Sequence, residues 1–573
     1  MTLKDTLKKL ALENAIKFKG KANPNALLGG VIKEHPEEKE NLTKIKTEIE
    51  TICEKINKLS LEEQKTELIK INPDFEKQKQ EKKQERRETR SSLPDLPNAI
   101  QGKVTTRIPP EPSKYNHLGH AMSFLINYLY AKKYDGKVIL RFDDTNPEKS
   151  TTEFVEAAKE DILNYLDIKP NKIIFASDHM NTYYLYAEKL VADGNAYVCS
   201  CNQETMSDGR RNGIECPHRN QDIEENKLLW KRMKDGKFKE GEAVLRLKID
   251  MQHKNAVMRD PVIYRLAYEN HYRAGTKYKV WPMYDFESTI EEGLCEITHV
   301  MRSNEFDSRI ELQKYIAKLF GFPEINYTHY GRYNVVGATT QGREIRALIE
   351  TGNYIGWDDP RLVTLRALKR RGIIRESYYE LAQKIGMSKT QTNLDFSSIA
   401  AINRALLDKT SKRFFGIVNP VVIKVHKIPS NLTEINLKFH PENEEKNRKL
   451  ELTDELYIEK EDILKIEIGQ VVRLMDCMNI KKISETEFDF ESLTHEEFKS
   501  NKNKTFLIHY VPKNGKEIEA EILMDDISVQ EIICEQSIEH LKVDEIVQFE
   551  RFAFCRLDQI DEDGTRLFWF THK

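Results

Sequence analysis

The first 75 residues carry apolar side chains at the spacing of an amphipathic helix, for example Leu7, Leu10, Leu12 and Ile16. The run that follows, QKQEKKQERRETR, has almost nothing apolar to bury and is typical of a solvated linker. Contact of its basic side chains with nucleic-acid phosphates is the functional alternative. We predict a helical N-terminal appendage with a charged linker over residues 1–92.

From Leu93 onward, short apolar strands alternate with helical stretches between Pro-rich turns. The segment KVILRF predicts a strand at Lys137–Phe142, and Ser123–Tyr134 predicts a helix. This alternation indicates an α/β nucleotide-binding core. A helical region is expected from about Gly356 to Lys412, where Pro and Gly are sparse.

Beyond about Arg413 the pattern is that of a β-protein. Short apolar runs, separated by polar turns, read NPVVIKVHKI, IGQVVRLMDCMNI, KTFLIHYV and DEIVQFERFAFCRL. Many short strands of this kind predict one or two β-barrels over residues 413–573.

Composition excludes some classes of protein but does not indicate a function. A chain of 573 residues exceeds what one core organises, so two to four domains are expected. With 39% hydrophobic and 32% charged residues, no stretch reaches the roughly 20 apolar residues that span a bilayer. The N-terminus lacks the features of a secretory signal, so a cytoplasmic protein is expected. The formal charge of -3 gives no global reason to expect a nucleic-acid partner.

A cluster of good zinc ligands lies in the segment CSCNQETMSDGRRNGIECPH. It contains Cys199, Cys201, Cys216 and His218, two pairs separated by a loop that can close around a tetrahedral ion. The other five cysteines stand far apart, so no disulfide scaffold is expected. We predict structural zinc, with ordinary core packing of the cysteines as the alternative.

An anion-binding turn is predicted in RIPPEPSKYNHLGHAMSFLINYLYAKKY. His117 and His120 flank Gly119 where a Pro-rich turn enters a helix, so imidazoles and free backbone N–H groups point the same way. Alone, this short pattern is weak, because surface histidines are ordinarily inert.

The same run resembles the signature motif of class I aminoacyl-tRNA synthetases. Three further segments, RFDDTNPEKS, WPMYDFESTIEEGLCEITHVMR and GWDDPRLVTLRALKRRGI, resemble the glutamyl and glutaminyl subfamily in the right order. The segments ALENAIKFKGKANPNALLGGVIKEHPE and VQFERFAFCRLDQIDEDGTRLFWFTHK are typical of the archaeal-type glutamyl enzymes. The resemblance therefore covers essentially the whole chain.

The resemblance implies ATP-dependent activation of glutamate and its transfer to the 3′-terminal ribose of tRNA. It assigns His117 and His120 to stabilising the reacting phosphates, and it assigns ATP binding to Pro109, His117, Gly119, His120 and Arg343. Asp143 would hold the α-ammonium of the amino acid, with Tyr284 and Ser288 lining its pocket. Arg107 and Arg302 would bind the side-chain carboxylate, as a guanidinium fork does.

One segment departs from the family. The family's mobile Lys-Met-Ser-Lys-Ser-like loop falls in VVGATTQGREIR, where this chain has Thr339, Thr340, Gln341, Gly342 and Arg343. Glycine replaces the second lysine, and neither serine is present. Arg343 or Arg346 is the candidate to reach the phosphates instead, and slow or lost activation is the alternative.

The resemblance implies a multidomain α/β plus all-β fold. We expect a helical appendage and linker (1–92), a Rossmann-like core in two halves (93–190 and 301–355), an acceptor-stem-binding insertion with the core return (191–300), a helical connector (356–412) and a β-barrel anticodon-binding region (413–573).

The implied partners are tRNA(Glu), glutamate and ATP with Mg²⁺, with tRNA(Gln) as a further substrate, in a monomeric enzyme without a membrane. A glutaminyl enzyme carries an uncharged residue at the position of Arg302 and is the closest alternative. A non-catalytic tRNA-binding protein derived from a synthetase is the other.

Overall fold

The structure is a computed structural model that describes residues 2–18, 20–35, 37, 41–72 and 93–573. The charged run predicted as a linker lies outside the described residues. The chain divides into two compact units, Met1–Ser92 and Leu93–Lys573, and each is described by itself.

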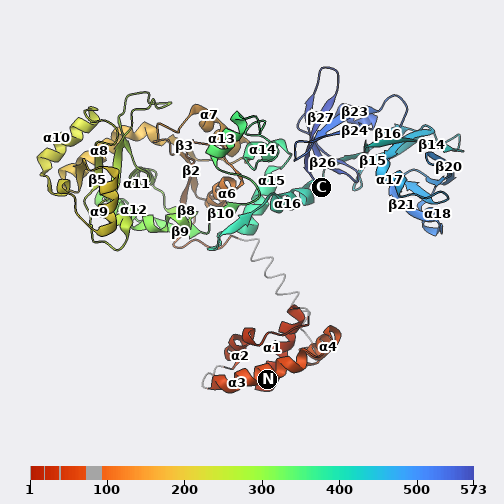
Figure 1. The fold of residues 1–573 in the computed structure, drawn as a ribbon, viewed down its shortest axis with the longest axis horizontal. Helices are drawn as coiled ribbons and strands as arrows, with labels where there is room; N and C mark the ends of the chain where they lie inside the picture. The colour runs from red at the N-terminus through yellow and green to blue at the C-terminus, as the bar shows by residue number, and fades with distance from the viewer. Residues whose placement is uncertain (1, 19, 36, 38–40, 73–92) are drawn as a thin grey trace. The chain divides into compact units, whose positions relative to one another are not determined.

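The N-terminal unit is helical, as its apolar spacing predicts (Figure 1). Its elements are α1 (Leu3–Lys17), η1 (Pro24–Ala26), α2 (Leu28–Glu34), α3 (Leu42–Ile56) and α4 (Leu61–Ile71). Leu7 and Leu12 are buried, and Leu10 and Ile16 pack against the same core. A capping box at Ser60 and Glu63 starts α4.

The centre of the larger unit is a parallel sheet. Strands β1 (Thr105–Ile108), β2 (Lys137–Phe142) and β3 (Lys172–Phe175) pair in that order. Strand β8 (His299–Ser303) pairs in parallel with β9 (Asn326–Tyr330). The backbone N–H of Thr298, just before β8, donates to the carbonyl of Thr105 at 3.0 Å, so β8 lies beside β1. The strand predicted from KVILRF has the expected bounds, and the α/β core is confirmed.

Helix α6 (Leu118–Lys133) and helix α7 (Thr152–Lys159), continued by η3 (Glu160–Tyr165), share a hydrophobic core with this sheet. The same part of the chain forms η4 (Ala176–His179), α11 (Tyr284–Leu294), η7 (Asn304–Arg309), α12 (Ile310–Phe320) and α13 (Gly342–Glu350). The predicted helix at Ser123 begins earlier, at Leu118, because His117 caps its N-terminus.

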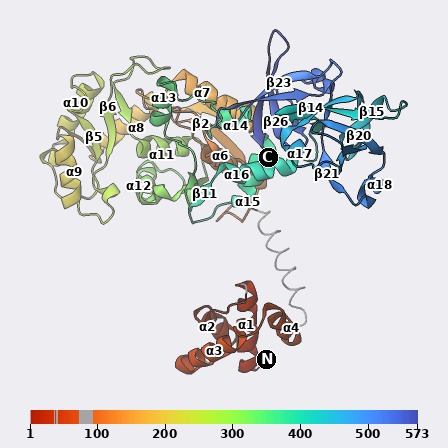
Figure 2. The ribbon, with the colours of Figure 1, turned by 45° about the vertical axis from the view of Figure 1, so that its right-hand side comes forward.

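An antiparallel sheet with its own helices and core lies at one end of this unit, and the C-terminal sheets lie at the other (Figures 1 and 2). The strands of the antiparallel sheet are β4 (Ala196–Cys199), β5 (Val244–Leu247), β6 (Val262–Leu266) and β7 (Val280–Pro282). Helices α8 (Met180–Ala192), α9 (Gln203–Asn212) and α10 (Ile223–Lys234) and turns η5 (Pro217–Asn220) and η6 (Ala256–Met258) accompany it.

The region predicted as a helical connector contains α14 (Leu365–Arg370), α15 (Arg375–Ile385) and α16 (Phe396–Leu407). It also contains a strand, β11 (Thr392–Leu394), which pairs in parallel with β10 (Tyr333–Val335). Arg370 holds the C-terminal region by two contacts: its guanidinium donates to Asp558 at 2.7 Å and lies 4.2 Å from the ring of Trp569.

The C-terminal region is built of strands, as predicted. One sheet has the order β12-β25-β26-β27-β23-β24-β13, and a second has the order β21-β18-β19-β20-β14-β17-β22. The first comprises β12 (Lys412–Phe414), β13 (Gly416–Val418), β23 (Ile518–Leu523), β24 (Val529–Cys534), β25 (Ile546–Phe549), β26 (Ala553–Ile560) and β27 (Arg566–His572). The second comprises β14 (Pro420–His426), β17 (Glu455–Glu459), β18 (Val471–Leu474), β19 (Asn479–Lys482), β20 (Glu487–Ser492), β21 (Lys504–Ile508) and β22 (Val511–Pro512).

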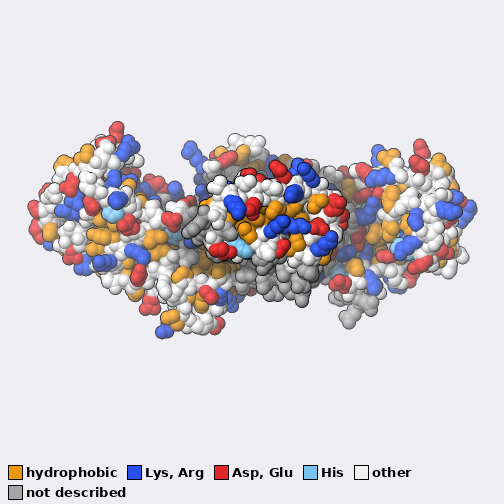
Figure 3. Space-filling view, turned by 90° about the horizontal axis from the view of Figure 1, so that it is seen from below, with side chains coloured by type: hydrophobic (Ala, Val, Ile, Leu, Met, Phe, Trp, Pro, Cys, Tyr) orange, Lys and Arg blue, Asp and Glu red, His pale blue; other side chains and the backbone are white. Residues whose placement is uncertain are grey.

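A hairpin of β15 (Glu434–His440) and β16 (Asn443–Glu451), with α17 (Lys460–Leu464), α18 (His495–Ser500) and η8 (Gln536–His540), completes this region. Among the described residues, no helix is both long and apolar enough to cross a membrane. On the face that Figure 3 shows, Lys and Arg side chains are interspersed with Asp and Glu, which agrees with the small net charge.

Candidate functional site

The N-terminus of α6 is built around two histidines. Nδ1 of His117 accepts a hydrogen bond from the backbone N–H of Gly119 at 3.1 Å, and Nδ1 of His120 accepts from the N–H of His117 at 3.2 Å. The two rings stack with their centroids 3.8 Å apart. A Cβ on Gly119 would lie 3.1 Å from the His117 ring and 3.3 Å from the carbonyl oxygen of Tyr333, so the packing favours glycine.

Both imidazoles are held neutral. Burial, reinforced by the positive charges of Lys114 and Arg332, lowers the pKa of His117 to about 3. Burial and the neighbouring His117 lower the pKa of His120 well below its usual range. Because each Nδ1 accepts a backbone N–H, the proton of each neutral ring lies on Nε2. The helix terminus therefore presents two neutral Nε2–H donors, while the backbone N–H groups of Leu118, Gly119 and His120 are already bonded within the protein.

The histidine turn is held by the segment that precedes α14. The backbone N–H of Leu118 donates to the carbonyl of Val363 at 3.1 Å, and the N–H of Leu365 donates to that of Asn116 at 2.9 Å. The motif GWDDPRLVTLRALKRRGI thus supports the motif that contains the histidines, although some 240 residues separate them in sequence.

Three arginines occupy equivalent places in the sheet. Arg107, Arg141 and Arg302 are each the last residue but one of their strands, β1, β2 and β8, and all three are buried. Ligands of open α/β sheets bind outside the carboxyl ends of the strands. The arginines therefore line the edge where a substrate is expected.

One face of α11 contacts all three arginines. Tyr284, Ser288 and Glu292 follow one another at intervals of one helical turn, so they share a face. The Tyr284 hydroxyl accepts from Nη1 of Arg302 at 3.0 Å, and the Ser288 hydroxyl accepts from Nη2 of Arg141 at 3.1 Å. The Glu292 carboxylate accepts from Nε of Arg107 at 3.1 Å and from the Ser288 hydroxyl at 3.3 Å.

Arg302 is fixed in place but keeps free donors. Besides Tyr284, its Nε donates to Nε2 of His329 at 3.1 Å and its Nη2 donates to Gln313 at 2.8 Å. Phe306 lies 5.0 Å from the guanidinium. A guanidinium has five N–H groups and three are used here, so one N–H on each Nη can bind a ligand carboxylate.

Asp143 follows β2 and is oriented by Arg141. Nε and Nη2 of Arg141 donate to the two carboxylate oxygens of Asp143 at 2.5 and 2.9 Å. The backbone N–H of Asp143 donates to the carbonyl of Pro110 at 3.1 Å, which places Asp143 beside the turn that contains the half-buried Pro109. Arg107, Asp143, Tyr284, Ser288 and Arg302, all expected at one site, therefore lie in one connected group.

No role was predicted for the other acidic side chains of α11. Glu287 is buried, and burial together with Asp143 raises its pKa well above the usual range. Glu291 is buried too, and it accepts from Tyr183 at 2.5 Å and contacts His179 at 2.7 Å. The signal was present in the spacing of Glu287 and Glu291, one turn apart on a helix that is otherwise apolar on that side.

The altered loop ends at α13. Gly342 is its first residue, and Arg343 is exposed and forms no hydrogen bond or ion pair with any described residue. Lys114 lies against Gly342: a Cβ built on the glycine would be 3.2 Å from the Lys114 Cβ. Neither Lys114 nor Arg332 was singled out by the sequence analysis, because a lone basic residue in a turn gives no signal.

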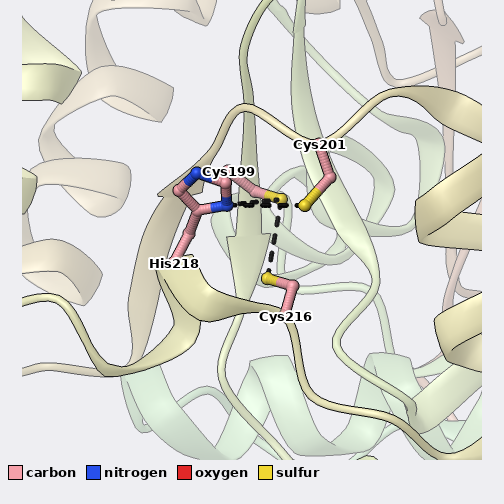
Figure 4. A group of neighbouring side chains, drawn as sticks. All are labelled: Cys199, Cys201, Cys216 and His218. Carbon is pink, nitrogen blue, oxygen red and sulfur yellow. Dashed lines mark hydrogen bonds between the residues drawn. The ribbon is translucent and has the colours of Figure 1, made fainter.

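The four predicted zinc ligands come together (Figure 4). Cys199 ends β4, Cys216 caps η5, and His218 lies within it. Sγ of Cys199 is 3.7 Å from Sγ of Cys216 and 3.8 Å from Nδ1 of His218, and Cys201 is 3.4 Å from the same nitrogen. Tetrahedral zinc with ligands at about 2.0–2.3 Å requires ligand separations of roughly 3.5–3.8 Å. The residues therefore fit zinc.

A buried cation supports this cluster. Nη1 of Arg246 lies 3.9 Å from Sγ of Cys199 and 3.7 Å from Sγ of Cys216. Its charge would offset that of the thiolates that bind a metal.

Comparisons with known proteins show the family of the chain. The family model "tRNA synthetases class I (E and Q), catalytic domain" matches residues 103–409, and two models described as anti-codon binding domains of the same class match residues 411–499 and 487–558. The chain is 41% identical to a glutamate–tRNA ligase of Pyrococcus abyssi, over 96% of this chain and 97% of that one.

Two further relatives are similar over 97% of both chains. A glutamate–tRNA ligase of Pyrococcus furiosus is 40% identical and one of Methanocaldococcus jannaschii is 36% identical. All three are glutamate enzymes, so neither the glutaminyl alternative nor a non-catalytic protein is favoured.

Proposed function

The chain belongs to the class I tRNA synthetases of the glutamate and glutamine group, and we propose that it is a glutamate–tRNA ligase. It joins glutamate to the AMP part of ATP as glutamyl-adenylate, with release of pyrophosphate, and then transfers glutamate to the 3′-terminal ribose of tRNA(Glu), with release of AMP. The observation that carries the proposal is the single face of α11 that contacts Arg302, Arg141 and Arg107.

The proposed substrate pose follows from charge. The side-chain carboxylate of glutamate takes the two free N–H groups of Arg302, with Tyr284 and the aromatic ring of Phe306 fixing the guanidinium. The α-ammonium binds Asp143, whose two oxygens keep lone pairs beyond those that Arg141 uses. This pose leaves the α-carboxylate free to react.

In the activation step, an oxygen of the α-carboxylate attacks the α-phosphorus of ATP, and the bond to the β-phosphate breaks. Pyrophosphate leaves with the electron pair. The Nε2–H groups of His117 and His120 stabilise the charge on the phosphate oxygens without giving up a proton, since both rings are neutral. Mg²⁺ enters with ATP and offsets the charge of its phosphates.

The Cys/His cluster is proposed to hold structural zinc through Cys199, Cys201, Cys216 and His218. The ligand separations support this assignment, and so does the neighbouring Arg246. The ion would order the antiparallel region that is proposed to contact the acceptor end of tRNA. Charging of tRNA(Gln), a monomeric state, a cytoplasmic location and a role of Arg343 in binding ATP stay predictions.

Acylation assays test the proposal directly. The full-length protein is offered labelled glutamate or labelled glutamine with transcripts of tRNA(Glu) and tRNA(Gln). Glutamate esterified to tRNA(Glu) is the expected result. Charging with glutamine alone would refute the assignment of the substrate, and absence of charging with intact tRNA binding would refute catalysis.

A further inference from the structure

Two positive charges, Lys114 and Arg332, lie near the histidine turn and form no ion pair with any described residue. Lys114 is half-buried. Burial lowers its pKa, and the nearby Arg332 acts in the same direction, while Glu111 opposes them. A cation that is partly withdrawn from water and unpaired is costly unless an anion binds there.

Lys114 is electrostatically coupled to both imidazoles. Its charge contributes to the lowered pKa values of His117 and His120. Lys114 therefore lies near both rings. An ammonium close to two neutral imidazoles forms an environment suited to a polyphosphate.

Lys114 also fills the space beside Gly342. A Cβ on Gly342 would lie 3.2 Å from Cβ and 3.6 Å from Cδ of Lys114. Gly342 is a helical residue and is absent from the glycines with positive φ, so the backbone itself would accept a side chain. A side chain at 342 would meet Lys114 first, so side chains at the two positions would lie against each other.

We propose that the ammonium group of Lys114 binds the triphosphate of ATP and stabilises the departing pyrophosphate. It supplies a positive charge that residues 339–343, which include no lysine, cannot supply through a lysine. Lys114 transfers no proton. The inference rests on the proposed adenylate-forming function and adds a residue to it. It also explains how a chain with glycine at 342 remains a working enzyme.

The test compares Lys114→Ala with the wild type in ATP–pyrophosphate exchange, measured with tRNA(Glu) present. We expect kcat/KM for ATP to fall about 10²-fold, as when one donor to a developing phosphate or oxyanion charge is removed. KM for glutamate should stay unchanged, whereas a general structural defect would change KM for both substrates. The matched control is Lys103→Ala, an exposed lysine before β1, and thermal unfolding of both variants verifies folding.

A relocation experiment makes the test sharper. Lys114→Gly frees the space beside position 342, so the double variant Lys114→Gly/Gly342→Lys carries the ammonium from the other side of the same site. We expect the exchange rate of the double variant to be at least tenfold higher than that of Lys114→Gly. A double variant as slow as Lys114→Gly would overturn the proposal that positions 114 and 342 serve the same phosphate site.

The outcomes separate this inference from the proposed function. A wild-type protein that charges tRNA(Glu) while Lys114→Ala keeps the wild-type KM and kcat for ATP would refute only the role of Lys114. If the wild type does not charge tRNA, the proposed function fails. ATP binding, measured by equilibrium dialysis, then tests the role of Lys114 by itself. Weaker ATP binding by Lys114→Ala than by Lys103→Ala then supports the site, and equal binding overturns it.

Discussion

Replacing Arg302 by alanine tests the glutamate pocket most directly. Nε, Nη1 and Nη2 of Arg302 each donate one hydrogen bond, to His329, Tyr284 and Gln313. Two of the five N–H groups remain for the substrate. Hydrogen bonds to charged groups contribute about 1.5–3 kcal/mol each, so losing two costs about 3–6 kcal/mol, or about 10²- to 10⁴-fold in kcat/KM for glutamate.

The assay is aminoacylation of tRNA(Glu) at varied glutamate, with KM for ATP measured alongside. Arg302→Lys is the matched variant: it keeps the charge but not the fork, and an intermediate loss is expected. Arg302→Ala also leaves the acceptors on His329, Tyr284 and Gln313 without this donor, so thermal unfolding is measured alongside to separate a loss of stability from a loss of substrate binding. Glutamate charging within tenfold of the wild type, or a loss confined to KM for ATP, would refute the proposed carboxylate site.

Three other outcomes are expected. Cys216→Ser, or a chelator, should lower both the zinc content measured by mass spectrometry and the Tm; a metal-free protein with an unchanged Tm would contradict the zinc assignment. The neutral His117, with its pKa of about 3, contributes stability above pH 6.5 that is lost as the pH falls toward 3, so His117→Asn should flatten the acid side of Tm against pH. Burial raises the pKa of Asp161 from 3.8 to about 7, so its stability contribution is full below pH 3.8 and lost as the pH rises through 7. Asp161→Asn should therefore stabilise by about 2–4 kcal/mol at pH 8 and not at pH 4, as denaturant unfolding would measure; equal effects at both pH values would contradict the raised pKa.

The fold was predictable wherever local pattern and tertiary packing agree. Strand β2 has its predicted bounds because every residue after Lys137 is buried, which is what a strand covered on both faces requires. Helix α6 begins before the apolar stretch that predicted it, since a histidine cap replaces the usual Ser, Thr, Asp or Asn. Strand β11 escaped prediction within the helical connector, because only pairing with β10 makes its three residues a strand.

The site was predictable where the residue type itself limits the chemistry. Three thiols and an imidazole within twenty residues have few uses other than metal binding, and the four lie together. Lys114 and Arg332 could not be found this way. Lys114 and Arg332 stand out because they form no ion pair with any described residue and because Lys114 contacts Gly342. Both features are properties of the packed structure.

The arrangement of the arginines explains why one helix can organise the whole proposed amino-acid pocket. Each arginine stands last but one in its strand, so the sheet fixes the three cations at one edge. Helix α11 then meets them with Tyr284, Ser288 and Glu292, one turn apart. Only Glu292 among these contacts is an acid, so the helix neutralises Arg107 but leaves Arg302 its charge. Arg141 is occupied by Asp143 at 2.5 Å. Of the three cations, Arg302 is therefore the one left without a carboxylate partner among the described residues, and we propose that the acidic side chain of the substrate is its partner.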